Sequence, residues 1–411
     1  MQQEIIPHLF RTEYSKIIAV LCNRFGIEHV EAAEDIVSDT FLTATELWGL
    51  KGVPQNPAAW LYTVAKNKTK NYLKRNSVFA GKIAKDLIAL QKDVQYEEID
   101  LSNESIADSQ LAMIFVVCHP GISSEAQIAL ALNLLCGFGV NEIADAFLTN
   151  KEVIYKRLKR AKEKLKEVNL NITAPVISNN DARLSSVLLT LYLLFNEGYY
   201  SVSGDHTIRK EFCMEAMRLN LIIIDNDKTN TPSANALMAL MCFHASRLRA
   251  RAGDDGEMIL YDKQDTDLWD TALIEKGISY LNAAAKGNTF SKFHLEAAIA
   301  YWHTHKEDTE EKWESVLQLY NQLLLLEYSP IAALNRTYAL SKANGVHEAI
   351  KEAEKLQLAD NHFYFILLGT LYTGIDNVKA LGHFNKAYSL AKSENDRAFI
   401  NEKIKELEDM F

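Results

Sequence analysis

The stretch "GVNEIADAFLTNKEVIYKRLKRAKEKLK", residues 139–166, decides how the middle of this chain folds. In its first part, Val140, Ile143, Ala144 and Phe147 recur at three- and four-residue spacing, which predicts a short helix with one apolar face. The turn "LTN" follows, and a longer stretch then repeats the same helical spacing. Two helices joined by so short a turn predict a helix-turn-helix.

The second helix carries the charge. We expect Val153, Ile154, Leu158 and Leu165 to face inward. Residues 150–166 hold two acidic side chains and eight basic ones. We expect the basic side chains to lie mostly outside: Lys151, Lys156, Arg157, Lys159, Arg160, Lys162, Lys164 and Lys166. An isolated helix of this composition is more often a solvated face, but the preceding helix and tight turn favour a DNA-binding role.

A major groove admits one helix, whose first turns meet base edges while later basic residues meet phosphates. Asn150, Lys151, Tyr155 and Lys156 occupy the early positions of this helix. Lys159 and Arg160 follow one turn later, where phosphate contacts are expected.

Helical spacing of apolar residues continues along almost the whole chain, so we predict an all-α fold. The chain has 411 residues, 48% of them hydrophobic and 24% charged, with only 17 glycines and 7 prolines. This length exceeds what one core usually holds, and two or three domains are expected. We place boundaries at 1–85, at an acidic linker 86–108, at 109–170 and at 171–411, and we expect a helix to start at Pro57.

Charge and cysteines narrow the class of protein. The net charge is -10, yet residues 1–170 carry 20 basic and 21 acidic side chains, so local basic faces decide whether DNA can bind. No membrane span or signal peptide is recognisable, and we expect a cytoplasmic protein with no membrane partner. Five cysteines without a C-x-x-C pair are expected to be buried free thiols.

Histidines near cysteines or near each other raise the question of a metal. The pairs lack a four-ligand spacing, and we expect neither a metal nor a cofactor: Cys118 with His119, Cys242 with His244, and His303 with His305. No nucleophile and base set or phosphate-binding glycine loop is recognisable, so we expect no catalytic residues and no enzyme.

A second basic segment is "WLYTVAKNKTKNYLKR", residues 60–75. Its cations and amides suit single-stranded DNA, because cations follow phosphates while aromatic or amide groups receive unstacked bases. The candidates are Trp60, Lys66, Asn67, Lys70, Asn71, Lys74 and Arg75. The alternative is that Trp60 and its apolar neighbours belong to the core, which leaves the polar face as the candidate.

Two stretches of the tail are related at an offset of 31 residues, with Ala349 equivalent to Ala380. The second stretch approaches the spacing of a tetratricopeptide repeat at Leu368, Gly369, Tyr372, Ala380, Phe384 and Ala387. Stacked helix pairs of this kind leave a concave surface, so a protein or peptide partner of the tail is possible.

The order of these motifs resembles a known family. "AEDIVSDTFLTA" at 33–44, then residues 60–75, an acidic linker and the helix-turn-helix resemble the extracytoplasmic-function group of sigma-70 factors. Beyond them, "LYLLFNEGYYS", "DLWDTALIEKG" and "SPIAALNRTYALS" resemble the subgroup with a long helical, tetratricopeptide-like C-terminal extension.

The resemblance implies a role for each segment. Residues 1–85 correspond to region 2, in which Asp35, Ser38, Asp39 and Phe41 fall in the segment that docks on bacterial core RNA polymerase. Family members usually have glutamine at the position of Ser38. The helix from Trp60 to Arg75, with the loop before it, would read and melt the minus-ten element of promoter DNA by capturing a flipped base.

Residues 109–170 correspond to region 4, which would place Asn150, Lys151, Tyr155, Lys156 and Arg157 over the minus-thirty-five element, with Lys159 and Arg160 on phosphates. Small residues with an arginine are usual where this chain has "EVIY", which indicates a promoter sequence of its own or a weaker contact.

Two hypotheses follow. The first is a promoter-recognition subunit that works with core polymerase and is regulated in cis by its acidic tail. The second is a helical interaction scaffold, or a stand-alone DNA-binding regulator, that does not engage polymerase.

Overall fold

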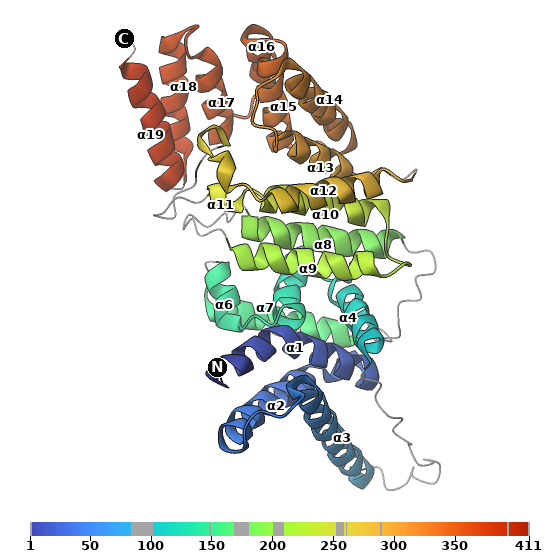
Figure 1. Ribbon diagram of the computed structural model, residues 1–411. Helices are drawn as coiled ribbons and strands as arrows, with labels where there is room; N and C mark the ends of the chain where they lie inside the picture. The colour runs from blue at the N-terminus through green and yellow to red at the C-terminus, as the bar shows by residue number, and fades with distance from the viewer. Residues whose placement is uncertain are drawn as a thin grey trace. The chain divides into compact units, whose positions relative to one another are not determined.

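A computed structural model describes most of the chain, and its regular elements are helices (Figure 1). The described residues are 2–83, 102–147, 149–167, 181–199, 209–251, 259, 261–287, 290–392 and 394–409. Within these ranges no β-strand occurs, which confirms the all-α prediction.

Two compact units share the helices, and the change from one to the other falls inside helices rather than at a linker. One unit comprises Met1–Leu194 and Leu221–Thr229, and the other comprises Phe195–Asn220 and Asn230–Phe411. The predicted boundary near residue 170 lies in the range 168–180, outside the described residues. Most of the following helix, residues 181–194, nevertheless belongs to the N-terminal unit.

The helices up to that change are α1 (Gln2–Phe25), α2 (Val30–Lys51), α3 (Pro57–Ile83), α4 (Asn103–Val117), α5 (Ser124–Leu130), α6 (Val140–Ala146), α7 (Lys151–Glu167), α8 (Asp181–Tyr199) and α9 (Lys210–Asp225). The later helices are α10 (Pro232–Ala245), α11 (Leu248–Arg251), α12 (Thr271–Ala284), α13 (Lys292–Trp302), α14 (Glu310–Leu326), α15 (Pro330–Ala343), α16 (Val346–Leu356), α17 (His362–Tyr372), α18 (Asn377–Leu390) and α19 (Glu394–Glu408).

Helix α1 is the centre of the N-terminal unit. Its residues Ile17, Ile18 and Leu21 are almost completely buried, and the helix contacts α2, α3 and α4. Burying such side chains contributes about 1.5–3 kcal/mol each, so α1 is the main apolar support for the helices around it.

The connection from α2 to α3 depends on local sequence. Gly52 has φ +82°, and its N–H donates to the Trp48 carbonyl at 3.0 Å, which closes the end of α2. Asn56 then caps α3, because its Oδ1 accepts from the Ala59 N–H at 3.0 Å. Pro57 is the first residue of α3, as predicted, since a proline in the first turn forfeits no helical hydrogen bond.

The acidic stretch before residue 109 is partly helical, so the predicted linker 86–108 is too long. Helix α4 begins at Asn103, and the Ser102 side chain accepts from the Ser105 N–H. Glu104 in the first turn favours this start, because a carboxylate there meets the positive end of the helix dipole. The earlier linker residues 86–101 lie outside the described residues.

The predicted helix-turn-helix is present as α6 and α7. The Gly139 N–H donates to Glu142 Oε2 at 2.7 Å at the start of α6, and the Thr149 N–H donates to the Ala144 carbonyl at 3.0 Å in the turn. Ile143 and Ala144 are buried, so the short helix places its apolar face inward as expected.

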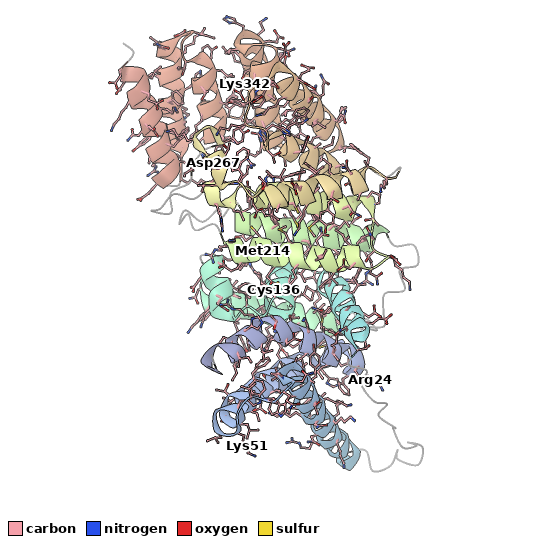
Figure 2. The ribbon with its side chains drawn as sticks, viewed as in Figure 1. Arg24, Lys51, Cys136, Met214, Asp267 and Lys342 are labelled. Atoms are coloured by element: carbon pink, nitrogen blue, oxygen red, sulfur yellow. The ribbon has the colours of Figure 1, made fainter. Side chains whose placement is uncertain are left out.

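The later part of the C-terminal unit, α14 to α19, consists of packed helix pairs, shown in orange and red in Figure 1. Ala349 and Ala380, the two positions matched by the internal repeat, are both 0% exposed. Helix α17 packs against α18 at Gly369, where the Phe384 ring fills the space that a Cβ would need. Elsewhere in this unit Lys342, which is labelled in Figure 2, donates to Asp308 Oδ2 at 2.9 Å. The tetratricopeptide assignment itself stays a prediction.

The cysteines are free, and Cys22, Cys118, Cys213 and Cys242 are buried, whereas Cys136 is half-buried (Figure 2). Burial raises the pKa of the Cys118 thiol to about 12. In the described part of the chain no helix combines the length and the apolar character needed to cross a membrane.

The close approach at Gly369 gives a stability prediction. A Cβ there would lie 2.8 Å from Phe384 Cε1. Gly369→Ala should therefore reduce the free energy of unfolding by about 1–3 kcal/mol and lower the thermal midpoint. Gly382 is an exposed residue of α18, and a Cβ there would have no atom within 4 Å. Gly382→Ala should therefore increase the free energy of unfolding by up to about 1 kcal/mol through helix propensity. Thermal unfolding followed by circular dichroism compares the two. Equal midpoints would show that the helices are not packed this closely.

Candidate nucleic-acid interface

Helix α7 presents its basic residues along one face. Lys151, Lys156, Lys159 and Arg160 are exposed, and Tyr155 is 60% exposed. Ile154, Leu158 and Leu165 are buried as predicted. The exposed cations therefore form a continuous surface that a phosphate backbone could contact.

Two side chains of α7 differ from the sequence prediction. Val153 is 45% exposed, because it lies on the stripe of Arg157 and Arg160 rather than on that of Ile154. Lys162 is only 8% exposed, because it flanks the inner stripe four residues after Leu158. The expectation that Val153 faces inward and Lys162 outward was therefore wrong.

Two predicted DNA contacts also have structural roles. The Oδ1 atom of Asn150 accepts from the Glu152 N–H at 2.9 Å and so caps α7. Arg157 Nη2 lies 2.9 Å from Glu125 Oε2 of α5. Both side chains are thus held in position at the start of the helix, which limits the conformational entropy they would lose on binding.

The predicted docking segment lies on α2, and its side chains differ in their exposure to solvent. Asp35, Ser38 and Asp39 are exposed, whereas Phe41 is 5% exposed and packs on Phe10 with ring centroids 5.1 Å apart. The Tyr14 hydroxyl and Ser38 Oγ are 3.3 Å apart. Phe41 thus supports the helix from its inner side, while the other three side chains are available at the surface.

Helix α3 provides the second basic surface. Trp60 is half-buried against Trp48, with ring centroids 5.3 Å apart, so it belongs partly to the core. The polar candidates lie further along α3: Asn67, Asn71, Lys74 and Arg75 are exposed, and Lys66 and Lys70 are half-buried.

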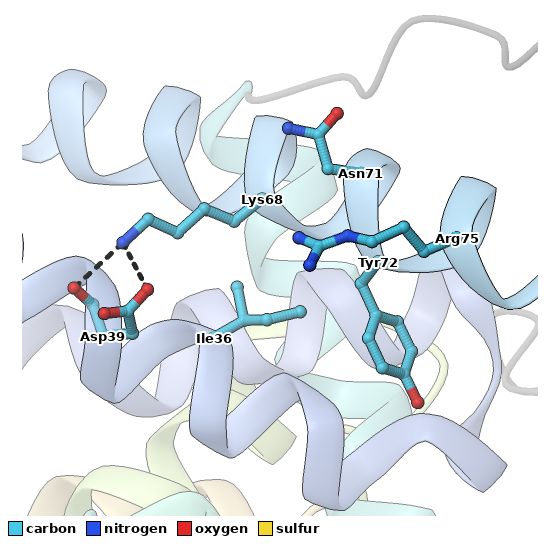
Figure 3. A pocket seen from close by; sticks show the side chains of 6 residues that line it. All are labelled: Ile36, Asp39, Lys68, Asn71, Tyr72 and Arg75. Atoms are coloured by element: carbon cyan, nitrogen blue, oxygen red, sulfur yellow. Dashed lines mark hydrogen bonds and ion pairs between the residues drawn. The ribbon is translucent and has the colours of Figure 1, made fainter.

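A pocket of about 260 Å³ lies between α2 and α3 (Figure 3). Its lining consists of Ile36, Asp39, Lys68, Asn71, Tyr72 and Arg75. At its edge Lys68 Nζ donates to Asp39 Oδ2 at 2.7 Å, to the Asp39 carbonyl at 3.0 Å and to Thr43 Oγ1 at 2.8 Å. All three N–H groups of the ammonium therefore bond to α2, and one ion pair joins the predicted docking residue Asp39 to α3, the helix predicted to read the minus-ten element.

A second set of ion pairs joins α7 to α2. Lys162 Nζ donates to both carboxylate oxygens of Glu34, at 2.7 and 2.8 Å, and Lys166 Nζ pairs with Glu31. Burial raises the pKa of Glu34, while Lys162 opposes that shift. The hydrogen bond from Lys166 lowers the pKa of Glu31. We call these four residues the α2–α7 contact.

Sequence reasoning did not identify the partners of Lys68 and Lys162. The apolar stripe of α7 placed Lys162 at the edge of the inner face, which was the available signal. Its partner lies 128 positions earlier, and nothing in the local pattern of either helix identifies that pairing.

Helix α8 forms hydrogen bonds to α4 and α5, the helices that precede the helix-turn-helix. Arg183 Nη2 donates to the Phe115 carbonyl at 2.9 Å, and Ser186 Oγ donates to the Cys118 carbonyl at 2.8 Å. The buried Thr190 hydroxyl donates to Gln127 Oε1 at 2.6 Å. Residues 181–194 of α8 are thus part of the N-terminal unit.

Comparison with known proteins identifies the class. Residues 9–78 match the model of sigma-70 region 2, and residues 183–285 match a family of unknown function, DUF6596. An uncharacterized protein of Rhizobium meliloti (strain 1021) is 30% identical over 384 residues, covering 92% of this chain and 90% of that protein. No solved structure matches significantly.

The chain therefore belongs to the sigma-70 family. More particularly, it belongs with the extracytoplasmic-function-like factors in which a long C-terminal extension follows region 2, and its role is in promoter recognition. The helices of region 2 are α1, α2 and most of α3.

The buried and the exposed residues of the predicted docking segment should differ in their effect on stability. Phe41→Ala should reduce the free energy of unfolding by about 3–5 kcal/mol, because it opens a cavity beneath Phe10 and Tyr14. Asp35→Ala, at an exposed position, should change it by less than about 0.5 kcal/mol. Urea denaturation of both variants measures the difference, and a Phe41→Ala protein as stable as the Asp35→Ala protein would contradict the burial of Phe41.

Proposed function

We propose that this chain binds bacterial core RNA polymerase through α2 and directs initiation by reading promoter DNA with α3 and α7. One observation carries the proposal: Asp35 and Asp39 are exposed on α2, and Asp39 lies at one pocket with Lys68, Asn71 and Arg75 of α3, all within the stretch that matches sigma-70 region 2. Docking and DNA recognition would therefore use adjacent surfaces of the same small domain.

The minus-ten element would be read by α3. Melting the duplex costs a few kcal/mol of unstacking, which contacts to an extruded base must offset. Asn71, Tyr72 and Arg75 offer an amide, an aromatic ring and a cation at one pocket, the combination that holds an unstacked nucleotide.

The minus-thirty-five element would be read by α7 as region 4. Lys151, Tyr155 and Lys156 are exposed over its first turns, where a recognition helix meets base edges. Exposed Val153 adds an apolar side chain suited to a thymine methyl group.

The extension would regulate the factor in cis. The hydrogen bonds of Arg183, Ser186 and Thr190 tie its first helix to α4 and α5, and α5 packs in turn against α7. Truncation after residue 170 should change promoter-dependent transcription. Because truncation also removes α8, Thr190→Val provides a second variant that keeps the helix and removes the bond to Gln127. Unchanged transcription by both variants at equal protein level would contradict regulation in cis.

Charge reversal tests polymerase docking. Asp35→Lys should abolish co-purification with core polymerase, because an exposed acidic group at the docking face becomes basic. Glu46→Lys makes the same change at another exposed position of α2 and should leave binding intact. Equal binding by both variants would place docking elsewhere. Failure of the unaltered chain to bind polymerase would favour a stand-alone DNA-binding protein.

Salt dependence tests α7. Lys159→Ala and Arg160→Ala should each weaken binding to duplexes of any sequence and reduce the log–log salt slope by about 0.9 for each phosphate that the variant no longer neutralises. Lys156→Ala should instead change base preference. Fluorescence anisotropy across a salt series measures both effects. An unchanged slope in the Lys159 and Arg160 variants would show that those side chains only face solvent.

A further inference from the structure

The C-terminal unit gathers three cations around the ring of Tyr261. Arg247 lies between α10 and α11, and Lys306 and Lys312 lie before and within α14 (Figure 1). The guanidinium carbon of Arg247 is 5.5 Å from the centroid of the Tyr261 ring, and each lysine Nζ is 5.3 Å from it. Arg247 is only 7% exposed and Lys312 only 1%. Positive charge is therefore concentrated where little water can screen it.

Arg247 differs from the two lysines in its partners. Lys306 and Lys312 each donate to backbone carbonyl groups. Within the described residues, by contrast, Arg247 forms no ion pair, and its buried Nε has no hydrogen-bond partner. A buried cation without an anion is strongly destabilising, and a contact with one aromatic ring offsets only a small part of that cost. A water molecule would satisfy the N–H group but would leave the charge uncompensated, so the position favours an anion.

Two more N–H groups close to this ring need a partner. Trp269 Nε1 and His303 Nδ1 are buried and have no hydrogen-bond partner in the described part of the chain. Their rings lie 6.2 and 5.3 Å from the Tyr261 ring, centroid to centroid. Burial, together with the charges of Arg247 and Lys312, lowers the pKa of the His303 ring to about 3. The ring is therefore neutral at pH 7, and Nδ1 can donate in one of its two tautomers.

One acceptor completes the set. Gln264 is 7% exposed, and its Nε2 donates to the Ile259 carbonyl at 3.2 Å. Its buried Oε1 has no donor among the described residues. A matching ligand is therefore an anion that accepts several hydrogen bonds and donates one. Phosphate with one protonated oxygen has these properties at neutral pH, whereas a carboxylate or sulfate has no proton to donate. The burial of the side chains excludes a duplex backbone, which could not reach them.

We propose that the C-terminal unit binds phosphate, free or as a small monoester, with Arg247, Trp269 and His303 as donors and Gln264 as acceptor. All except His303 lie in residues 183–285, which match the family of unknown function DUF6596. The inference does not rest on the proposed function, because binding is measured without polymerase or DNA.

Thermal unfolding and titration calorimetry of the full-length chain, prepared in phosphate-free buffer, test this site. The thermal midpoint of the unaltered chain should rise with the concentration of inorganic phosphate, because the ligand binds only the folded state. Arg247→Met keeps an unbranched side chain beside Tyr261 but removes the charge, and should weaken phosphate binding about 10–100-fold. Without phosphate this variant should be at least as stable as the unaltered chain, because an uncompensated cation is gone. Arg249→Met makes the same change at an exposed position of α11 and should do neither.

Trp269→Phe is a second variant that keeps an aromatic ring and removes one N–H donor, and it should weaken binding about 3–10-fold. Inorganic phosphate and glycerol phosphate are titrated separately, and tighter binding of one identifies the source of the phosphate group. Sulfate at the same ionic strength should stabilise the chain less. Equal stabilisation by sulfate, equal effects of phosphate on the unaltered chain and Arg247→Met, or no binding of either phosphate would refute the site. Lower stability of Arg247→Met in phosphate-free buffer would also contradict it, because the cation would then already have a partner.

Discussion

The ion pair between Glu34 and Lys162 is the constraint on which the N-terminal unit depends. It joins helices far apart in the sequence and is largely removed from water. A buried charge without its partner would cost several kcal/mol. An apolar contact of the same size would tolerate sliding, whereas a lysine that meets both oxygens of one carboxylate fixes a single register. Helix α2 thereby sets the position of α7.

Helix α2 contributes side chains to the core, to the exposed surface and to two ion pairs. Its inner side, with Val37 and Phe41, packs in the core, and exposed Asp35 faces solvent. Along its edges Asp39 holds Lys68, and Glu34 holds Lys162. Its carboxylates therefore occupy cations of both basic helices, and any phosphate that binds those cations competes with an existing partner. Under the proposed function, such competition would link α2 to DNA binding.

Local sequence predicted much of this molecule because its signals are local. The start of α3 at Pro57 and the turn before α7 each depend on a few adjacent residues. Acidic residues before position 109 were interpreted as a linker, although Ser102 and Glu104 are good helix-start residues. Val153 was misplaced because an apolar residue next to an apolar stripe need not belong to it.

The remaining features required the three-dimensional structure. Periodicity states which face of a helix is apolar but not which distant side chain a cation at its edge will meet. The partners of Lys68 and Lys162 are of this kind, and so are the bonds of α8 to Phe115, Cys118 and Gln127. The roles of exposed side chains such as Asp35 and Lys159 depend on partners outside the chain, so their assignments stay predictions.

Footprinting of a promoter selected by this chain tests the central claim most directly, since it reports both elements in one experiment. The account predicts that the chain and core polymerase together protect the minus-ten and minus-thirty-five elements on the same DNA molecule, and that the chain alone does not protect both. Protection of both elements by the chain alone, or the absence of promoter protection when polymerase is present, would contradict it.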